Sequence, residues 1–378
     1  MENRYKIKDY FDNVETIKEH NGYTYSVGRT LTILILGSMC GLKSVSEICQ
    51  WAESERVSKF LWEHFDIMNV PCYFWFTSLL KLIKPESLNQ CFINWVQYLV
   101  SDERKNKTVS FDGKTVRSTG KMKKYENPLH IVSAQIAELG LTIGQKTVDG
   151  KSNEIPAVQD LIKLLDINEC MIVADALNCQ KKTAKLIING GGDYLLNVKD
   201  NQQELKEGIE DYVQDEDLQK TMDKATTIEK NRDRIERRTA YSTKDIDWIP
   251  NKKDWVSLSC IGAINTQIQF TNKNETSNEW HYYISSRELS GEELLKYGRL
   301  EWSVETMHYI LDIHFNEDFC RVEDRNVQQN LNMARKIAMN SVRNYKNKTQ
   351  SKRAFSKIFL DCLLESEKIL SILNTCEN

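Results

Sequence analysis

The stretch KTVSFDGKTVR, residues 107–117, decides the fold because it predicts a strand that carries a carboxylate in its interior. Asp112 interrupts the β-rich run, and Gly113 follows it directly. Burying an unpaired carboxylate costs free energy, so the chain needs a reason to place one here. A bound metal ion is one reason, and an Asp that caps the next turn is the other.

Short apolar runs after this stretch predict an α/β core. Two more β-rich runs follow Gly and polar breaks, and the later run CMIVADA is typical of a strand buried on both faces. Strands are expected at 129–137, 141–148, 170–176 and 194–199, and helices at 156–165 and 181–188. This order predicts a mixed sheet flanked by helices.

Helical regions and an insertion flank the core. The capping-box spacing from Ser44 to Glu47 and Pro85 at a first helical position predict helices in the N-terminal region. A charged helix at 202–219 opens a mainly β insertion, and two helical stretches close the chain. We therefore expect an N-terminal helical domain at 1–104, the first part of the core at 105–204, the insertion at 205–289, and the completion of the core with C-terminal helices at 290–378.

Two further acidic residues stand in a setting like that of Asp112. Asp175 ends the apolar run 171–174, and Glu305 lies in an expected helix spanning 300–313. The polar stripe beside the core-facing seam of that helix consists of Glu301, Glu305, His308 and Asp312. Together the three carboxylates suit a hard cation such as Mg²⁺, which prefers oxygen ligands. The plain alternative is two capping Asp residues and a solvated helix face.

The composition restricts the classes of function. With 51 Lys+Arg and 54 Asp+Glu the net charge is −3, so any nucleic-acid surface must come from local basic clusters. The ten Cys form no Cys-x-x-Cys pair, which predicts free thiols and no zinc site. The longest apolar stretch, Leu31 to Leu42, is shorter than the roughly 20 residues of a membrane span. With no signal-peptide centre near the start, we expect a cytoplasmic protein without membrane contact.

Several long segments resemble the DDE transposases of bacterial insertion sequences. They are VSFDGKTVR (109–117), HIVSAQIAELGLTIGQKTVDGKSNEIPAVQDLI (130–162), VADALNCQKKTAKLIINGGGDYLLNVKDNQ (173–202) and EWSVETMHYILDIHFNEDFCR (301–321). The nearest resemblance is to the ISAs-type group, also called H-repeat-associated proteins. The segment VPCYFWFTSLLKLIKPESLNQCFINWVQYL (70–99) is similar to the helical region that precedes the catalytic domain in that group.

The resemblance implies an RNase H-like core with Asp112, Asp175 and Glu305 as the catalytic and metal-binding triad. It implies Mg²⁺, with Mn²⁺ as an alternative, and cleavage and joining of DNA strands. The partners it implies are double-stranded DNA, both terminal inverted repeats and target DNA, and further copies of the chain in a dimer or larger synaptic assembly. The 130 residues from Asp175 to Glu305 leave room for the β-rich insertion that related transposases carry there.

The chain departs from the pattern of the wider superfamily around Glu305. That pattern is Tyr-x2-Arg-x3-Glu-x6-Lys, and this chain has Gly298, Glu301 and Asp312 at its other three positions. An anion at Glu301 replaces a residue expected to face DNA. A decayed or domesticated DNA-binding protein and a metal-dependent nuclease acting outside transposition therefore remain alternatives.

Basic residues are the candidates for phosphate contact, because each Lys or Arg that neutralises a phosphate adds salt-sensitive affinity. A solvated charged surface is the plain alternative for each cluster. The candidates are Lys114, Arg117, Lys121, Lys123, Lys124, Lys199, Arg234, Arg237, Arg238, Arg343, Lys346, Lys352 and Arg353. Tyr125 and Trp302 have rings that can stack on a base, although core packing is the expectation for Trp302.

Overall fold

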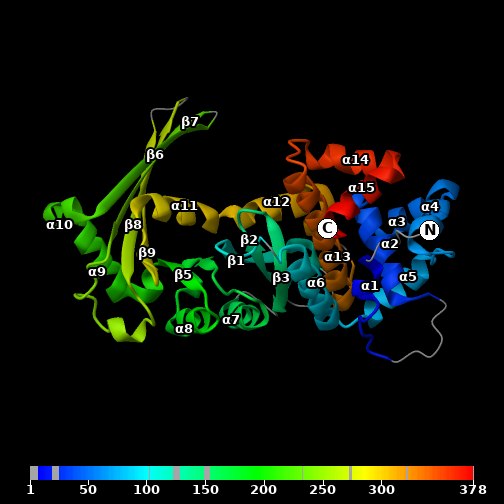
Figure 1. The fold of residues 1–378 in the computed structure, drawn as a ribbon, viewed down its shortest axis with the longest axis horizontal. Helices are drawn as coiled ribbons and strands as arrows, with labels where there is room; N and C mark the ends of the chain where they lie inside the picture. Colours follow the sequence, from blue (N-terminus) through cyan, green and yellow to red (C-terminus); the bar gives the residue numbers. More distant parts are fainter. Residues whose placement is uncertain are drawn as a thin grey trace.

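A mixed sheet lies at the centre of the structure, which is a computed structural model. It describes residues 7–18, 25–101, 103–121, 128–148, 154–231, 233–271, 275–320 and 322–377. In this described part the strands are β1 (Thr108–Val116), β2 (Leu129–Ile136), β3 (Leu141–Val148), β4 (Met171–Ala174), β5 (Asp193–Val198), β6 (Asp223–Asn231), β7 (Arg234–Thr243), β8 (Cys260–Phe270) and β9 (Thr276–Ser285). They form one sheet in the order β3-β2-β1-β4-β5-β9-β8-β7-β6 (Figure 1).

The first five strands form the core predicted from the sequence. β2 is antiparallel to β1 and β3, whereas β4 lies parallel to both β1 and β5. This order and these directions are those of an RNase H-like sheet, and they confirm the expected fold class. The insertion continues the same sheet, because β9 pairs antiparallel with β5.

Strand β4 shows why the core needs cover on both faces. Side chains alternate along a strand, so Ile172 and Ala174 join the main hydrophobic core, whereas Met171 and Val173 belong to a second cluster. That second cluster includes Leu294 of helix α11 (Gly291–Glu301). Helices therefore pack on both faces of the sheet, as the uninterrupted apolar run predicts.

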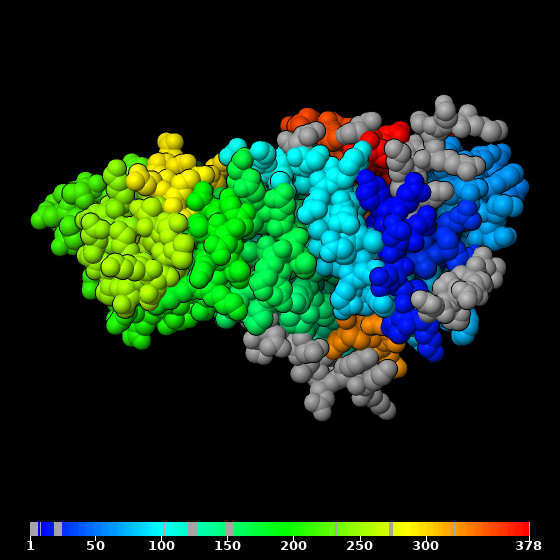
Figure 2. Space-filling view, turned by 60° about the horizontal axis from the view of Figure 1, so that its bottom comes forward, coloured from blue at the N-terminus to red at the C-terminus, as the bar shows by residue number. Residues whose placement is uncertain are grey.

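The other helices surround the sheet and build the N-terminal end of the molecule. Residues 7–99 contain α1 (Ile7–Phe11), α2 (Val27–Met39), α3 (Val45–Glu53), α4 (Glu55–Phe65), α5 (Tyr73–Leu82) and α6 (Pro85–Leu99). Later come α7 (Glu154–Leu164), α8 (Lys181–Asn189), α9 (Gln203–Gln214), α10 (Glu216–Thr221), α12 (Ser303–Phe315), α13 (Arg325–Lys348), α14 (Phe355–Leu364) and α15 (Ser366–Glu377). In Figures 1 and 2 the N-terminal helices and the insertion occupy opposite ends of the molecule, with the core between them.

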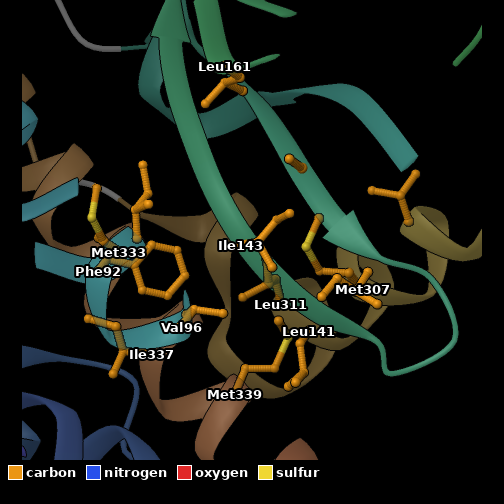
Figure 3. Packing of buried hydrophobic residues seen from close by; sticks show 14 of the residues in the cluster. Phe92, Val96, Leu141, Ile143, Leu161, Met307, Leu311, Met333, Ile337 and Met339 are labelled. Atoms are coloured by element: carbon orange, nitrogen blue, oxygen red, sulfur yellow. The ribbon is translucent and has the colours of Figure 1, made fainter. Parts of the chain in front are cut away.

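Helix α13 joins the N-terminal helices to the core. Its buried Asn330 donates to the carbonyl oxygens of Leu80 and Ile83, and its Asn340 donates to that of Thr142. Figure 3 shows Met333 and Ile337 of α13 near Phe92 of α6. Shared polar and apolar contacts thus fix the helical end against the sheet.

Several details of the sequence interpretation are confirmed, and three expected long helices are broken. Ser44 and Glu47 form the predicted capping box, and Pro85 begins α6. The sequence predicts helices at 48–65, 202–219 and 300–313, and these break at Ser54, Asp215 and Trp302 respectively. Strand β6 was not expected, because its Lys, Thr and Glu residues show little apolar alternation.

Two expectations concern thiols and membranes. All ten Cys are free thiols, as predicted, and eight of them are buried. Across the described ranges, no helix combines the length and the apolar character that a membrane span requires.

Candidate active site

The register of two parallel strands brings Asp112 and Asp175 together. Phe111 of β1 pairs with Ala174 of β4, so the next residue on each strand is one of the two Asp residues. Asp175 lies just beyond the carboxyl end of β4, where ligand sites form in open α/β sheets. Its Oδ1 accepts from the side-chain amide of Asn178 at 2.8 Å and caps a short 3-10 helix.

Helix α12 supplies Glu305. The preceding helix α11 ends at Glu301, and Trp302 has non-helical backbone angles, so α12 starts anew with Glu305 in its first turn. Val304 and Met307 are buried in the main core and fix the helix over β1. Figure 3 shows Met307 and Leu311 near Leu141 of β3.

These three elements meet at one pocket of about 500 Å³. Asp112, Asp175 and Glu305 all line it, although 63 and 130 residues separate them along the chain. The other lining residues are Phe111, Ala176, Leu177, Asn197, Lys199, Glu279, His281, Glu301, Trp302 and Val304. Elements distant in sequence thus place the carboxyl groups of the three candidate ligands, together with those of Glu279 and Glu301, around one cavity.

Burial and mutual repulsion dominate the electrostatics of the two Asp residues. The pKa of Asp112 is raised to about 6, chiefly by burial and to a smaller extent by the charges of Asp175, Glu154 and Glu305, against a hydrogen bond from the Gly113 amide that lowers it. Burial also raises the pKa of Asp175, while hydrogen bonds from Asn178 lower it. Carboxylates that repel one another in this way favour a cation between them.

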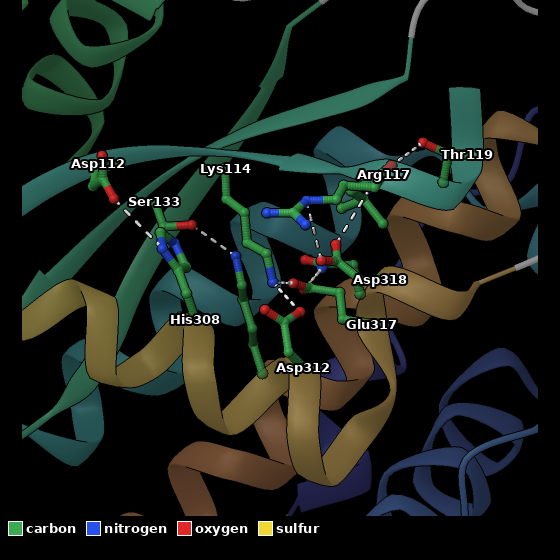
Figure 4. A network of polar contacts seen from close by, with 12 residues as sticks. Asp112, Lys114, Arg117, Thr119, Ser133, His308, Asp312, Glu317 and Asp318 are labelled. Carbon is green, nitrogen blue, oxygen red and sulfur yellow. Dashed lines mark hydrogen bonds and ion pairs between the residues drawn. The ribbon is translucent and has the colours of Figure 1, made fainter. Parts of the chain in front are cut away.

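A buried polar network lies beside Asp112 (Figure 4). Nδ1 of His308 is 3.4 Å from Oδ2 of Asp112, and burial lowers the pKa of His308 to about 3, so the ring is neutral. Nearby, the fully buried Lys336 donates to Ser133 and Gln145, each at 2.7 Å. Neutral His308 is therefore a contact that orients Asp112 from α12.

Glu301 lines the same pocket, and its surroundings favour the protonated form of its carboxyl group. Burial raises the pKa of Glu301 to about 8, and its side chain hydrogen-bonds with Asn197 and Tyr283. The raised pKa weakens the anionic character expected at this position.

The donor set fits a hard divalent cation. All three candidate ligands are carboxylates, and oxygen donors with open positions for water are what Mg²⁺ prefers. Within the ranges that the structure describes, no three His, Cys, Asp or Glu side chains are grouped as tightly as one ion requires. The three carboxylates therefore line one pocket, but they lie further apart than they would around a bound ion.

Comparison with known proteins identifies the family. Residues 103–341 match the family described as "Transposase DDE domain", and residues 8–96 match a family described as associated with it. This chain belongs to the DDE transposase family. The three pocket carboxylates all fall within the part that matches the DDE domain.

Relatives of this transposase family member match nearly its whole length. "H repeat-associated putative transposase YhhI" of Escherichia coli K12 is 30% identical over 90% of this chain and 92% of that protein. "Putative transposase YncI" of Escherichia coli O157:H7 is 28% identical over 95% and 93%. A solved structure, the piggyBac transposase synaptic complex with hairpin DNA, covers 99% of this chain and 80% of that one, with a TM-score of 0.45 and 11% identity.

The candidate phosphate ligands near the triad lie in different surroundings. Lys199 is exposed, lines the pocket and has no ion pair among the described residues. Lys114 is largely buried, and its Nζ pairs with Asp312 and, at 2.5 Å, with Glu317 (Figure 4). Arg117 is mostly exposed, with Asp318 at 3.8 Å. Lys199 and Arg117 are thus open to a ligand, whereas Lys114 belongs to a buried ion network.

Candidates in the insertion also differ in their ion pairs. Arg238 is held by Glu229 and Glu236, and Arg234 pairs with Glu236 at 2.6 Å. Arg237 is exposed, with no ion pair in the described structure. In the antiparallel register of β6 and β7, Arg237 lies opposite Ile228 and Arg238 lies opposite Thr227. Because side chains alternate along a strand, these neighbouring Arg residues point to opposite faces of the β6–β7 arm, the two-stranded ribbon that β6 and β7 form.

The C-terminal candidates are mostly engaged within the chain. Arg343 lies with its guanidinium 4.8 Å from the ring centre of Phe355, Lys346 donates to main-chain carbonyls, and Arg353 pairs with Asp361. Lys352 is exposed at a separate pocket. Lys123, Lys124 and the side chain of Lys121 lie outside the described residues, as does Tyr125.

Two features of the site were missed or misjudged from the sequence. Trp302 is 47% exposed and lines the pocket beside His281, so the expected core packing is wrong. Glu154 and His130 form a buried pair next to Asp112, which no local pattern in the sequence indicates because the two are 24 residues apart.

Proposed function

We propose that this chain is an insertion-sequence transposase that binds the ends of its element and cuts and joins DNA strands with a divalent cation. The observation that carries the proposal is the meeting of Asp112, Asp175 and Glu305 at one pocket. Family membership supports transposition as the process. Mg²⁺ is the proposed ion, with Mn²⁺ as a substitute.

In this proposal the three carboxylates hold the cation, and other pocket residues bind the DNA. The cation, when bound, activates the attacking oxygen and stabilises the leaving oxygen of a phosphodiester. His308 keeps Asp112 oriented through the 3.4 Å contact, without adding a charge. Lys199 is placed to bind a phosphate at the rim, and the exposed ring of Trp302 offers a surface for a base.

The reaction consists of two phosphoryl transfers. In the first, water adds to phosphorus at the element end and the bond to the 3′ oxygen breaks, which leaves a 3′ hydroxyl and a 5′ phosphate. In the second, that 3′ hydroxyl attacks a target phosphodiester and releases a 3′ hydroxyl of the target. Because two ends must be joined in one event, we propose that at least two copies of the chain assemble on DNA.

The proposed DNA path extends from the pocket along α11. A second hollow of about 460 Å³ lies between this helix and the β6–β7 arm, and Lys296 and Arg299 line it. Lys296 is exposed and has no ion pair among the described residues, whereas Arg299 pairs with Glu229. Since α11 leads directly into α12, duplex DNA on this face reaches Glu305.

The test is strand cleavage by the purified full chain on a duplex that carries the terminal inverted repeat, with Mg²⁺ or Mn²⁺. Asp175→Asn is expected to lose cleavage by at least a thousandfold while its DNA affinity changes less than threefold, because the amide keeps the shape but binds no cation. Asp217→Asn is the matched control, since the side chain of Asp217 is 93% exposed and is not among the residues that line the pocket. Cleavage by Asp175→Asn at the wild-type rate would reject the mechanism.

Two other results would favour the alternatives. DNA binding without cleavage by the wild-type protein indicates a decayed or domesticated binding protein. Cleavage that ignores the terminal repeat and yields no joined product indicates a nuclease acting outside transposition.

A further inference from the structure

Glu154 is a buried carboxylate that the proposed mechanism has not used. It begins α7, it is 5% exposed, and it packs against the strand that carries Asp112. A methyl group added to Gly113 would lie 2.7 Å from Cδ of Glu154 and 2.7 Å from Nε2 of His130. Gly113, the residue after Asp112, therefore lets Glu154 and His130 approach the main chain of β1.

His130 lies directly against this carboxylate. Its Nε2 is 2.8 Å from Oε1 of Glu154, and its Nδ1 is 2.8 Å from the hydroxyl of Thr115. Both side chains of the pair are almost fully buried. Thr115 and His130 are register partners on β1 and β2, so the sheet itself positions the ring that contacts Glu154.

Glu154 is also close enough to act on both Asp residues. Its charge raises the pKa of Asp112 more than that of Glu305 does, although burial is the largest cause. It also raises the pKa of Asp175, and α7 packs against the 3-10 helix that Asp175 caps. The two Asp residues thus share a third buried neighbour of the same charge, which comes from α7 and not from α12.

We propose that Glu154, oriented by His130, is a fourth acidic residue of the cation site, whose charge strengthens the binding of a divalent cation at Asp112 and Asp175. This inference rests on the proposed function, which places the cation there. Without a cation the buried charges repel one another, and a bound cation relieves that repulsion. Glu154 is a positioning residue, because it affects cation binding only through its charge on the two Asp residues.

The experiment measures Mn²⁺ affinity of the full chain by the loss of the free-ion electron paramagnetic resonance signal, and the melting temperature without metal. Glu154→Gln is expected to weaken Mn²⁺ binding by about tenfold, the scale of lost outer-shell partners at metal sites. The melting temperature without metal should stay equal or rise, because the variant removes a repulsive charge and keeps the size of the side chain.

Glu138→Gln is the matched control. The carboxylate of Glu138 accepts hydrogen bonds from the amide and hydroxyl of Thr108, at the other end of β1. This purely structural carboxylate should show the opposite result, with a lower melting temperature and unchanged Mn²⁺ affinity. Glu154→Asp, which keeps the charge, should bind Mn²⁺ more tightly than Glu154→Gln does.

The outcomes separate this inference from the proposed function. If the wild type binds Mn²⁺, Asp112→Asn does not, and Glu154→Gln binds as the wild type does, only the role of Glu154 is rejected. A lower melting temperature for Glu154→Gln with unchanged affinity also rejects it. If the wild type and Asp112→Asn bind Mn²⁺ equally, the cation site itself is rejected.

Discussion

Asp112 of β1 lies beside Asp175, which directly follows the parallel strand β4, and burial together with the charge of Asp175 raises the pKa of Asp112 to about 6. An acid with a raised pKa destabilises the folded protein when it is ionised, so the apoprotein loses stability as the pH rises from about 4 to about 6. Binding of a cation requires that same ionised form. The pair is thus arranged for a charged ligand and not for the stability of the empty fold.

The first prediction concerns the pH dependence of cation binding. The Mn²⁺ affinity of the full chain should fall as the pH drops through about 6, because a proton on Asp112 competes with the ion for the carboxylate and removes its charge. Titrations between pH 5 and 8, followed by the free Mn²⁺ signal, measure this. A midpoint near 4, the ordinary value of an exposed Asp, would contradict the burial of the site.

The second prediction separates Lys114 from Lys199. Lys114→Gln leaves the buried Glu317 and the partly exposed Asp312 without their cation, so it should lower the free energy of unfolding by about 3 kcal/mol. DNA affinity of the folded variant should stay at the wild-type level. Urea denaturation and DNA titration at a temperature where the variant is folded provide the two measurements.

Lys199→Gln should give the reverse result. Lys199 is exposed at the rim of the pocket with no ion pair in the described part of the chain, so its loss should change stability by less than about 0.5 kcal/mol. DNA affinity should fall measurably at low salt. Equal DNA affinity for Lys199→Gln and the wild type would remove Lys199 from the proposed interface.

Lys114 and Lys199 show which features of the candidate site can be predicted from the sequence and which cannot. Lys114 lies within β1 and Lys199 directly follows β5, and the sequence predicts both as phosphate ligands. Their difference depends on Asp312 and Glu317, which lie about 200 residues from Lys114 along the chain and meet it only after α12 packs on β1. No local pattern carries that information.

The elements that were predicted correctly have local causes. The run 171–174 is apolar at every position, which already implies a strand covered on both faces, and Ser44 with Glu47 is a self-contained cap. The break at Trp302 and the edge strand β6 were missed because tertiary contacts decide them. The triad positions came from the family resemblance, since burial and the strand register that bring them together are not visible in spacing.

The third prediction concerns Gly113. Gly113→Ala should lower the free energy of unfolding by about 1 to 3 kcal/mol, the usual cost of overpacking, because its methyl group meets Glu154 and His130. Gly144→Ala is the comparison, since the nearest atom there, at 3.2 Å, is the flexible end of Leu165. Chemical denaturation compares the two, and a cost for Gly144→Ala as large as that for Gly113→Ala would show that the Glu154–His130 pair is not tightly held.

The last prediction concerns the face of the insertion that meets DNA. Lys199 and Lys296 lie on the side of the catalytic pocket and α11, whereas Arg237 points to the opposite face of the β6–β7 arm from Arg238. If duplex DNA follows α11 to the pocket, each phosphate contact contributes about 0.9 to the slope of log affinity against log salt. The double variant Lys199→Gln, Lys296→Gln should flatten that slope by roughly two units.

Arg237→Gln is the matched control, because it removes one exposed charge from the β6–β7 arm, on the face opposite to that of Arg238. It should leave the slope unchanged, and all variants should keep the wild-type melting temperature, since neither Lys199, Lys296 nor Arg237 has an ion pair in the described structure. Binding of a fluorescent element-end duplex across a salt series gives the slopes. A flatter slope for Arg237→Gln together with a wild-type slope for the double Lys variant would place the DNA on the face away from α11, because only charges that neutralise phosphates release counterions.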